Sequence, residues 1–126
     1  MFDVLGVRIG INICFDLHFS ESVQRASDAG VTLLACPCSN MMRRDAAEKW
    51  KPRHNEIRSR QAREHGVWIL SADIIGERDG YVSYGPTAVI DPSGTVVAQV
   101  PLSETGVVMA EIERVPERQR AARYYK

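Results

Sequence analysis

The stretch VRIGINICF, residues Val7–Phe15, decides the fold of this chain. Branched apolar residues recur at every second position in it: Val7, Ile9, Ile11 and Ile13. A period of two is typical of a β-strand. The helical segment Ser20–Ala29 follows within a few residues. A strand that leads directly into a helix is the first half of a β-α-β unit, so this stretch predicts an α/β fold.

Both ends of the segment Ser20–Ala29 carry residues that favour a helix boundary. Ser20 is a suitable N-cap, and Glu21 places a negative charge in the first turn, where it interacts favourably with the helix dipole. Gly30 suits the left-handed position just after a helix. We therefore expect a helix between these two boundaries.

Two more strands and one more helix are predicted downstream. The run Val31–Cys36 is short and continuously apolar, which is typical of a strand covered on both faces, and Pro37 ends it. Ser39–Lys51 is interpreted as a loop or a broken helix. Pro52–His65 has a helical composition, and Val67–Ala72 is a second buried strand. The resulting order β-α-β-α-β implies right-handed crossovers and a mostly parallel sheet.

The C-terminal third has a different pattern. Asp, Pro and Gly at the first, second and fourth positions of Asp91–Gly94 are typical of a type I turn, which predicts a hairpin between Thr87–Ile90 and Thr95–Val100. A final strand is expected over Val107–Ile112. We predict that residues 1–113 form one partial domain and that 114–126 form a tail that packs on a partner.

Composition excludes several classes of protein. The 126 residues include 16 Lys and Arg against 16 Asp and Glu, so the net charge is zero and a nucleic-acid partner is not expected. Hydrophobic residues make up 44% and charged residues 25%, an ordinary globular mixture. No apolar run is long enough to cross a bilayer, and no signal-peptide pattern is present. We therefore expect no membrane partner and a cytoplasmic location.

The chain has three cysteines, Cys14, Cys36 and Cys38. An odd number in a chain of this size favours reduced thiols over a disulfide framework. The sequence C-P-C has no second Cys or His pair at the spacing of a zinc site, so we expect no metal and no cofactor. Cys36 is interpreted as a small buried hydrophobic residue.

Cys14 is the most informative of the three. It ends a predicted strand and is followed by a short turn into a helix, and ligands of α/β sheets gather at such carboxyl ends. A thiol on this turn is presented much as a nucleophile elbow presents its serine. Backbone N–H groups just after it are placed to stabilise a thiolate or an oxyanion. From these residues alone, a nucleophile and an inert buried cysteine both remain open.

Four segments resemble the nitrilase (carbon–nitrogen hydrolase) superfamily, in the right order and spacing across residues 2–113. GINICFD at 10–16 with FSE at 19–21 resembles the pattern G-x-x-I-C-[YF]-D…[FY]-P-E, which holds the catalytic cysteine of that family. VTLLACP at 31–37 resembles its buried strand that ends in proline. Trp50 with RSRQAREHGVWI at 58–69 resembles its W…RARAxENxxyv segment, and YGPTAVIDPSGTVV at 84–97 its DPxG hairpin.

This resemblance implies a fold and an activity. The chain would be the C-terminal half of an α-β-β-α sandwich and would contribute Cys14 as the nucleophile for nonpeptide C–N bonds of amides, nitriles or carbamoyl compounds. The family's glutamate base and its lysine precede the cysteine motif, and neither is carried over to this chain. Phe15 and Asn40 are candidates for oxyanion or substrate contacts, and Asp16 and Glu21 for structural support near the site.

Other polar residues are given less specific interpretations. A dyad of Cys14 with His18 is conceivable, but the resembled family does not use that position. His54 and His65 are expected on the surface of a charged helix, and Glu48 and Lys49 in a solvated loop.

Two hypotheses follow for the chain as a whole. In the first, it is the C-terminal part of a cysteine-dependent hydrolase for a small amide or nitrile, inactive without the N-terminal half. In the second, it is a noncatalytic binding or assembly module derived from the same fold. Both predict a bare sheet face that would expose an apolar patch on its own, and both predict a homo-oligomer.

Overall fold

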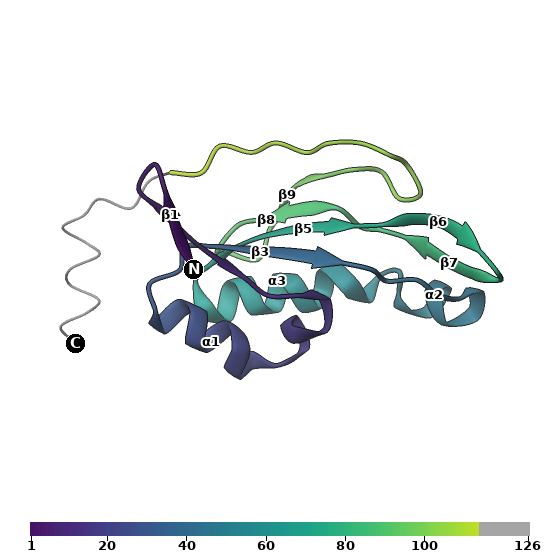
Figure 1. Cartoon of the computed structure of the whole chain (residues 1–126), viewed down its shortest axis with the longest axis horizontal. Coiled ribbons are helices and arrows are strands. Elements are labelled where there is room, and N and C mark those ends of the chain that lie inside the picture. The colour runs from purple at the N-terminus through teal and green to yellow at the C-terminus, as the bar shows by residue number, and fades with distance from the viewer. Residues whose placement is uncertain (114–126) are drawn as a thin grey trace.

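The computed structural model describes residues 1–113, which form two β-sheets and a layer of helices (Figure 1). The larger sheet has six strands in the order β1-β2-β3-β5-β8-β9, and the smaller has three in the order β4-β7-β6. The elements run along the chain as β1 (Phe2–Val4), β2 (Val7–Ile11), the 3-10 helix η1 (Cys14–His18), α1 (Ser20–Asp28), β3 (Leu33–Cys38), β4 (Met42–Arg43), α2 (Arg44–Trp50), α3 (Arg53–His65), β5 (Trp68–Asp73), β6 (Ile75–Arg78), β7 (Tyr81–Tyr84), β8 (Ala88–Ile90) and β9 (Val96–Gln99).

The centre of the large sheet confirms the predicted β-α-β-α-β order. Strands β2, β3 and β5 are parallel, with Gly10 opposite Leu34 and Leu34 opposite Ile69. The prediction of a mostly parallel sheet is wrong: the sheet is mixed, because hairpins join β1 to β2 and β8 to β9, and β1, β8 and β9 all pair in the antiparallel sense. Strand β1 was not expected, since three residues are too short for a periodic pattern to show.

Helices α1 and α3 lie side by side on one face of the large sheet (Figure 1). The core lies between them and the sheet, and its buried residues include Val23, Leu34, Ala62 and Ile69. Gly10 is required in β2, because a Cβ there would lie 3.0 Å from Val31 Cγ2 and 3.2 Å from Leu34 Cδ1. Close packing of the first crossover therefore depends on this glycine.

The opposite face of the large sheet has no helix over it in the described chain (Figure 1). Ile11 of β2 points away from the helices and is 56% exposed, and Pro37 and Ala72 of the neighbouring strands are exposed as well. The sequence resemblance predicts that the N-terminal half of an α-β-β-α sandwich contacts this face. That contact stays a prediction. Among the described residues, no helix is long and apolar enough to span a membrane.

The predicted hairpin is confirmed as β8–β9. Its turn is closed by hydrogen bonds from Gly94 N–H to the Asp91 carbonyl and from Asp91 N–H to the Thr95 carbonyl, both 2.9 Å. The strand predicted over Val107–Ile112 is wrong. Val107 and Met109 are each 88% exposed, and the alternating pattern there has no neighbouring strand to pair with in the described chain. The predicted tail at 114–126 lies outside the described residues.

The start of α1 and the segment Ser39–Lys51 differ from expectation. Ser20 is the first residue of α1 rather than its N-cap; Phe19 takes the capping position, and the Ser20 hydroxyl hydrogen-bonds His65 Nε2 at 2.9 Å instead. Gly30 follows the helix with φ of +78°, as predicted. The segment interpreted as a loop or broken helix contains β4 and α2, and β4 joins the small sheet, which was not predicted.

Candidate active site

Cys14 lies on a tight turn between β2 and α1 and has φ of +45°, a left-handed conformation that a side chain rarely adopts. Strand pairing ends at Ile11, so Cys14 begins the 3-10 helix rather than closing the strand as expected. Asp16 holds this turn: its carboxylate accepts a hydrogen bond from Ile13 N–H at 2.9 Å, and its own N–H bonds the Ile13 carbonyl at 3.0 Å. Asp16 therefore stabilises the turn that carries Cys14, and its supporting role in a catalytic site stays a prediction.

Two further contacts position this turn against the rest of the fold. The side chain of Gln61 on α3 is almost fully buried, and its Nε2 donates to the Leu17 carbonyl at 2.9 Å. On the strand side, Asn12 N–H donates to the Ala35 carbonyl at 3.0 Å, and the Asn12 amide donates to the Ser22 hydroxyl. The turn is therefore held from α3, β3 and α1 together.

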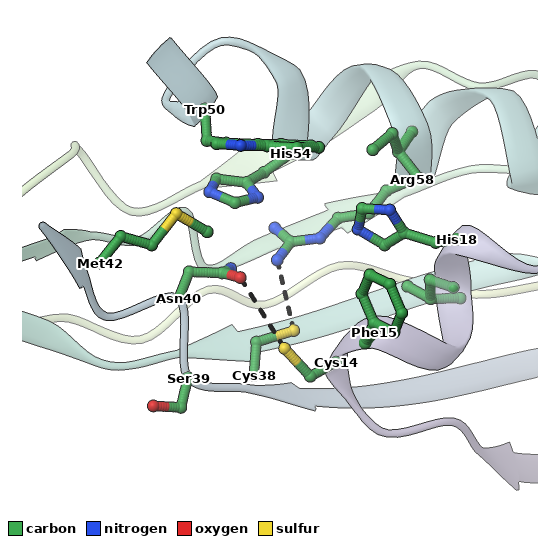
Figure 2. A pocket seen from close by; sticks show the side chains of 12 residues that line it. Cys14, Phe15, His18, Cys38, Ser39, Asn40, Met42, Trp50, His54 and Arg58 are labelled. Carbon is green, nitrogen blue, oxygen red and sulfur yellow. Dashed lines mark hydrogen bonds between the residues drawn. The ribbon is translucent and has the colours of Figure 1, made fainter. Parts of the chain in front are cut away.

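An open pocket of about 270 Å³ lies beside Cys14, at the carboxyl ends of β2 and β3 (Figure 2). Its walls come from η1, from the segment after β3, and from the start of α3. The lining residues are Cys14, Phe15, Leu17, His18, Cys38, Ser39, Asn40, Met42, Trp50, His54, Ile57 and Arg58. Phe15 and Asn40, the predicted substrate or oxyanion candidates, are both among them.

Asn40 connects the thiol to a buried ion pair of Arg58 and Asp73. The Cys14 thiol hydrogen-bonds the Asn40 Oδ1, with 3.8 Å between sulfur and oxygen (Figure 2). The Asn40 backbone N–H donates to Asp73 Oδ1 at 3.1 Å, and its side-chain amide donates to Asp73 Oδ2. Asp73 also accepts from Arg58 Nη2 at 3.4 Å, and both of these side chains are buried. The pocket floor is therefore one polar network.

The family model for "Carbon-nitrogen hydrolase" matches residues 1–122 of this sequence. The chain belongs to the carbon–nitrogen hydrolase family. The resemblance of the four sequence segments is thereby confirmed.

Individual relatives agree with this assignment. A nitrilase of Pyrococcus abyssi is 30% identical over 113 residues, which are 90% of this chain and 40% of that protein. Omega-amidase NIT2-B of Xenopus laevis is 30% identical over 115 residues, 90% of this chain and 39% of that protein. In fold alone, the chain is similar to the crystal structure of an amidase from Nesterenkonia, with a TM-score of 0.71 at 24% identity over 83% of this chain and 37% of that one. The chain spans about 40% of the length of the curated relatives it matches.

The second and third thiols of this carbon–nitrogen hydrolase chain lie next to each other on β3. Cys36 Sγ and Cys38 Sγ are 3.5 Å apart, and Cys36 is buried, as predicted. The hydrogen bond to Cys36 and burial raise the pKa of the Cys38 thiol far above its ordinary value. Cys38 is therefore protonated near neutral pH, although it lines the pocket.

An aromatic wall borders the pocket opposite Asn40 (Figure 2). The ring centroids of Phe15 and His18 are 4.7 Å apart, those of His18 and Trp50 5.6 Å, and those of Trp50 and His54 5.9 Å. Burial lowers the pKa of both His18 and His54, and nearby positive charge adds to it, from Arg60 and then Arg58 at His18 and from Arg58 at His54. Both imidazoles are therefore neutral at pH 7 and above.

His54 corrects the prediction for the polar residues. It was expected on the surface but is only 8% exposed, because its face of α3 turns toward the pocket and packs on Trp50. Glu48 and Lys49 are exposed on α2 and lie outside the pocket residues. Glu21 is exposed in the first turn of α1, also outside them, so its predicted supporting role is not visible in this geometry.

Sequence reasoning missed Arg58 and Asp73 as parts of the site. Two signals were present: His54 and Arg58 are four residues apart on one helix face, and Asp73 ends the strand Trp68–Asp73 at the same sheet edge as Cys38. Within residues 1–113, no group of three or more His, Cys, Asp or Glu side chains is arranged to hold a metal ion.

Proposed function

We propose that this chain is the C-terminal part of an enzyme that hydrolyses nonpeptide C–N bonds of small amides, nitriles or carbamoyl compounds, with Cys14 as the nucleophile. The observation that carries the proposal is the placement of Cys14. Its strained turn at the carboxyl end of β2 directs the thiol into a pocket of about 270 Å³. A nucleophile elbow achieves the same presentation of a side chain.

The reaction proceeds in two steps for an amide substrate. The general base takes the Cys14 proton, and the thiolate attacks the carbonyl carbon. The tetrahedral intermediate collapses to a thioester when the base returns this proton to the amide nitrogen, which leaves as ammonia. Water then attacks the thioester, which releases the carboxylic acid and restores the thiol. The Phe15 backbone N–H directly follows the nucleophile and is the candidate from this chain to stabilise the oxyanion. Asn40 orients the thiol.

The proposal assigns the general base to residues outside this chain. Each half-reaction needs a proton acceptor, and both histidines of the pocket pack against aromatic rings instead of forming a hydrogen bond with Cys14. The family resemblance implies a glutamate base and a lysine from the preceding half of an α-β-β-α sandwich. That half would cover the sheet face on which Ile11 is exposed, and the chain alone would be inactive.

A related amidase supports this chemistry by analogy. In the Nesterenkonia enzyme, acrylamide adds to the active-site cysteine, and another form of that enzyme is in complex with butyramide. The pocket of about 270 Å³ beside Cys14 has room for a neutral amide of this size.

Acrylamide provides the first experiment. We expect it to modify Cys14 before Cys36 and Cys38, as read by peptide mass spectrometry, because Cys36 is buried and Cys38 is protonated. In the full-length protein, Cys14→Ser is expected to reduce amide hydrolysis by at least about 1,000-fold, since a serine hydroxyl is a far weaker nucleophile near pH 7. Hydrolysis that survives Cys14→Ser contradicts the proposal.

The bare sheet face favours a second candidate, a noncatalytic assembly module. Exposed apolar residues such as Ile11 and Ala72 form a surface that a second copy of the chain could cover as well as the missing half. This candidate predicts a homo-oligomer that is unchanged by Cys14→Ser and has no turnover of amides in the full-length protein. Sedimentation velocity with an activity assay separates the two candidates.

A further inference from the structure

The pocket beside Cys14 contains a single formal charge among the described residues that line it, the guanidinium of Arg58. That charge is compensated directly behind the pocket wall. Asp73 Oδ2 lies 3.4 Å from Arg58 Nη2, and the two side chains are 0% and 4% exposed. A buried pair of opposite charges presents little net field to a group that enters the pocket.

The hydrogen-bond donors of Arg58 are also engaged. Nη1 donates to the Pro86 carbonyl at 2.8 Å and to Asn55 Oδ1 at 3.3 Å, while Nη2 donates to Cys38 Sγ at 3.3 Å and to Asp73. A bidentate contact with a substrate carboxylate would have to break contacts on at least one terminal nitrogen. Arg58 is therefore a structural cation and not a free anion receptor.

The other described residues that line the pocket give a carboxylate no counter-charge. His18 and His54 are neutral because burial lowers the pKa of each. Phe15, Met42 and Trp50 present apolar or aromatic surface, which favours a group that is itself apolar. A carboxylate placed there would lose its hydration without gaining a partner.

We propose that Asp73 is a specificity-determining residue: by neutralising Arg58 it makes the pocket at Cys14 accept neutral acyl groups and reject acyl groups that carry a carboxylate. This inference rests on the proposed function, because it concerns the acyl group attached to Cys14. An enzyme in which this arginine had no such partner could instead use it to bind the free carboxylate of a dicarboxylic acid amide.

Two alkylating agents of nearly equal size test the inference without any catalytic turnover. Iodoacetamide is neutral, and iodoacetate is fully ionised at neutral pH. Both react with the same thiolate, so the ratio of their rates at one pH cancels the ionised fraction of Cys14. Glutathione supplies the ratio for an unhindered thiol. We expect Cys14, read by peptide mass spectrometry, to favour iodoacetamide at least about tenfold more than glutathione does.

Variants of the ion pair move this ratio in opposite directions. Asp73→Asn leaves the guanidinium uncompensated and is expected to shift the ratio about tenfold toward iodoacetate. A shift of this size corresponds to the attraction between one positive charge and the iodoacetate carboxylate several ångströms away in a partly buried site. Arg58→Gln leaves the carboxylate uncompensated and is expected to shift the ratio toward iodoacetamide. A general loosening of the fold would move both variants in the same direction.

Two controls complete the experiment. The double variant Arg58→Gln/Asp73→Asn restores a neutral pair and is expected to return the ratio to the wild-type value, even if a single variant folds poorly. Glu77→Gln removes one negative charge from an exposed ion pair with Arg44 and leaves the ratio unchanged. A wild-type ratio equal to that of glutathione overturns the inference. Amide hydrolysis that survives Cys14→Ala overturns the proposed function instead, so the two failures are distinguishable.

Discussion

The Cys14 thiol donates a hydrogen bond to the amide oxygen of Asn40, 3.8 Å away, and Asn40 is itself oriented by two hydrogen bonds to Asp73. The orientation of the amide is thereby determined: its NH₂ group faces the carboxylate, so its oxygen must face the thiol. The nucleophile therefore has a defined direction before any substrate arrives.

Asn40→Ala is expected to lower kcat of the full-length enzyme about tenfold with little change in KM, because the thiol loses the contact that aligns it for attack. Steady-state kinetics with a small neutral amide measure this split. The variant Asn40→Asp serves as a comparison. It places a second carboxylate next to Asp73 and is expected to be more harmful than the alanine, since the two like charges repel. An increase in KM alone would indicate that Asn40 binds substrate instead of positioning the thiol.

Asp16→Ala is expected to destabilise the turn at Cys14 by about 1 kcal/mol, because the Ile13 N–H loses its capping acceptor at 2.9 Å. Urea unfolding measures the loss, and the rate of Cys14 alkylation reports on the turn itself. Asp16→Asn keeps an acceptor oxygen and should recover most of the stability. Asp28→Ala is the matched control, since that carboxylate is exposed at the C-terminal end of α1, away from Cys14, and accepts a hydrogen bond from Gln24. Equal effects at the two positions would contradict a local role for Asp16.

Gly10→Ala is expected to destabilise the fold by about 1–3 kcal/mol, because the added methyl would meet Val31 and Leu34 side chains at 3.0–3.2 Å. Ala72→Val adds larger groups to the open face of the same sheet and is expected to change stability by less than about 0.5 kcal/mol. Denaturant midpoints of the two variants compare the faces directly. If Gly10→Ala were neutral, the assignment of the helix-covered face would be wrong.

Stability is expected to fall as the pH drops through the range in which unfolded histidine titrates. Burial and the charge of Arg58 lower the pKa of His54 from 6.5, so the unfolded chain binds more protons than the folded one over the interval between the two values. The free energy of unfolding therefore rises with pH there, and the stabilising contribution is present above pH 6.5 and lost below it. Urea midpoints between pH 5 and 8 measure the slope. His54→Gln should flatten it, and an unchanged slope in that variant would assign the effect to other groups.

Local patterns were sufficient for the elements that surround Cys14. The strand at Val7–Ile11, the helix that follows it and the buried strands at Leu33–Cys38 and Trp68–Asp73 depend on periodicity and on residues that favour element ends, which are properties of neighbours in the chain. The same holds for the turn at Asp91–Gly94. The patterns failed where the outcome depended on a partner far along the chain. Ser20 bonds His65 instead of capping its own helix, and residues 107–112 have no strand to pair with.

The sequence by itself determined the family of this protein, because four segments in order resemble that family, and this resemblance made Cys14 the candidate nucleophile. The succession of strand, turn and helix placed Cys14 at a sheet edge. Only the tertiary structure decided the environment of that thiol. Asn40, Arg58 and Asp73 come from three separate segments and meet because β3 and β5 are parallel, with Cys38 opposite Asp73. Charge compensation inside the pocket is a property of distances between those segments, and no local pattern encodes such distances.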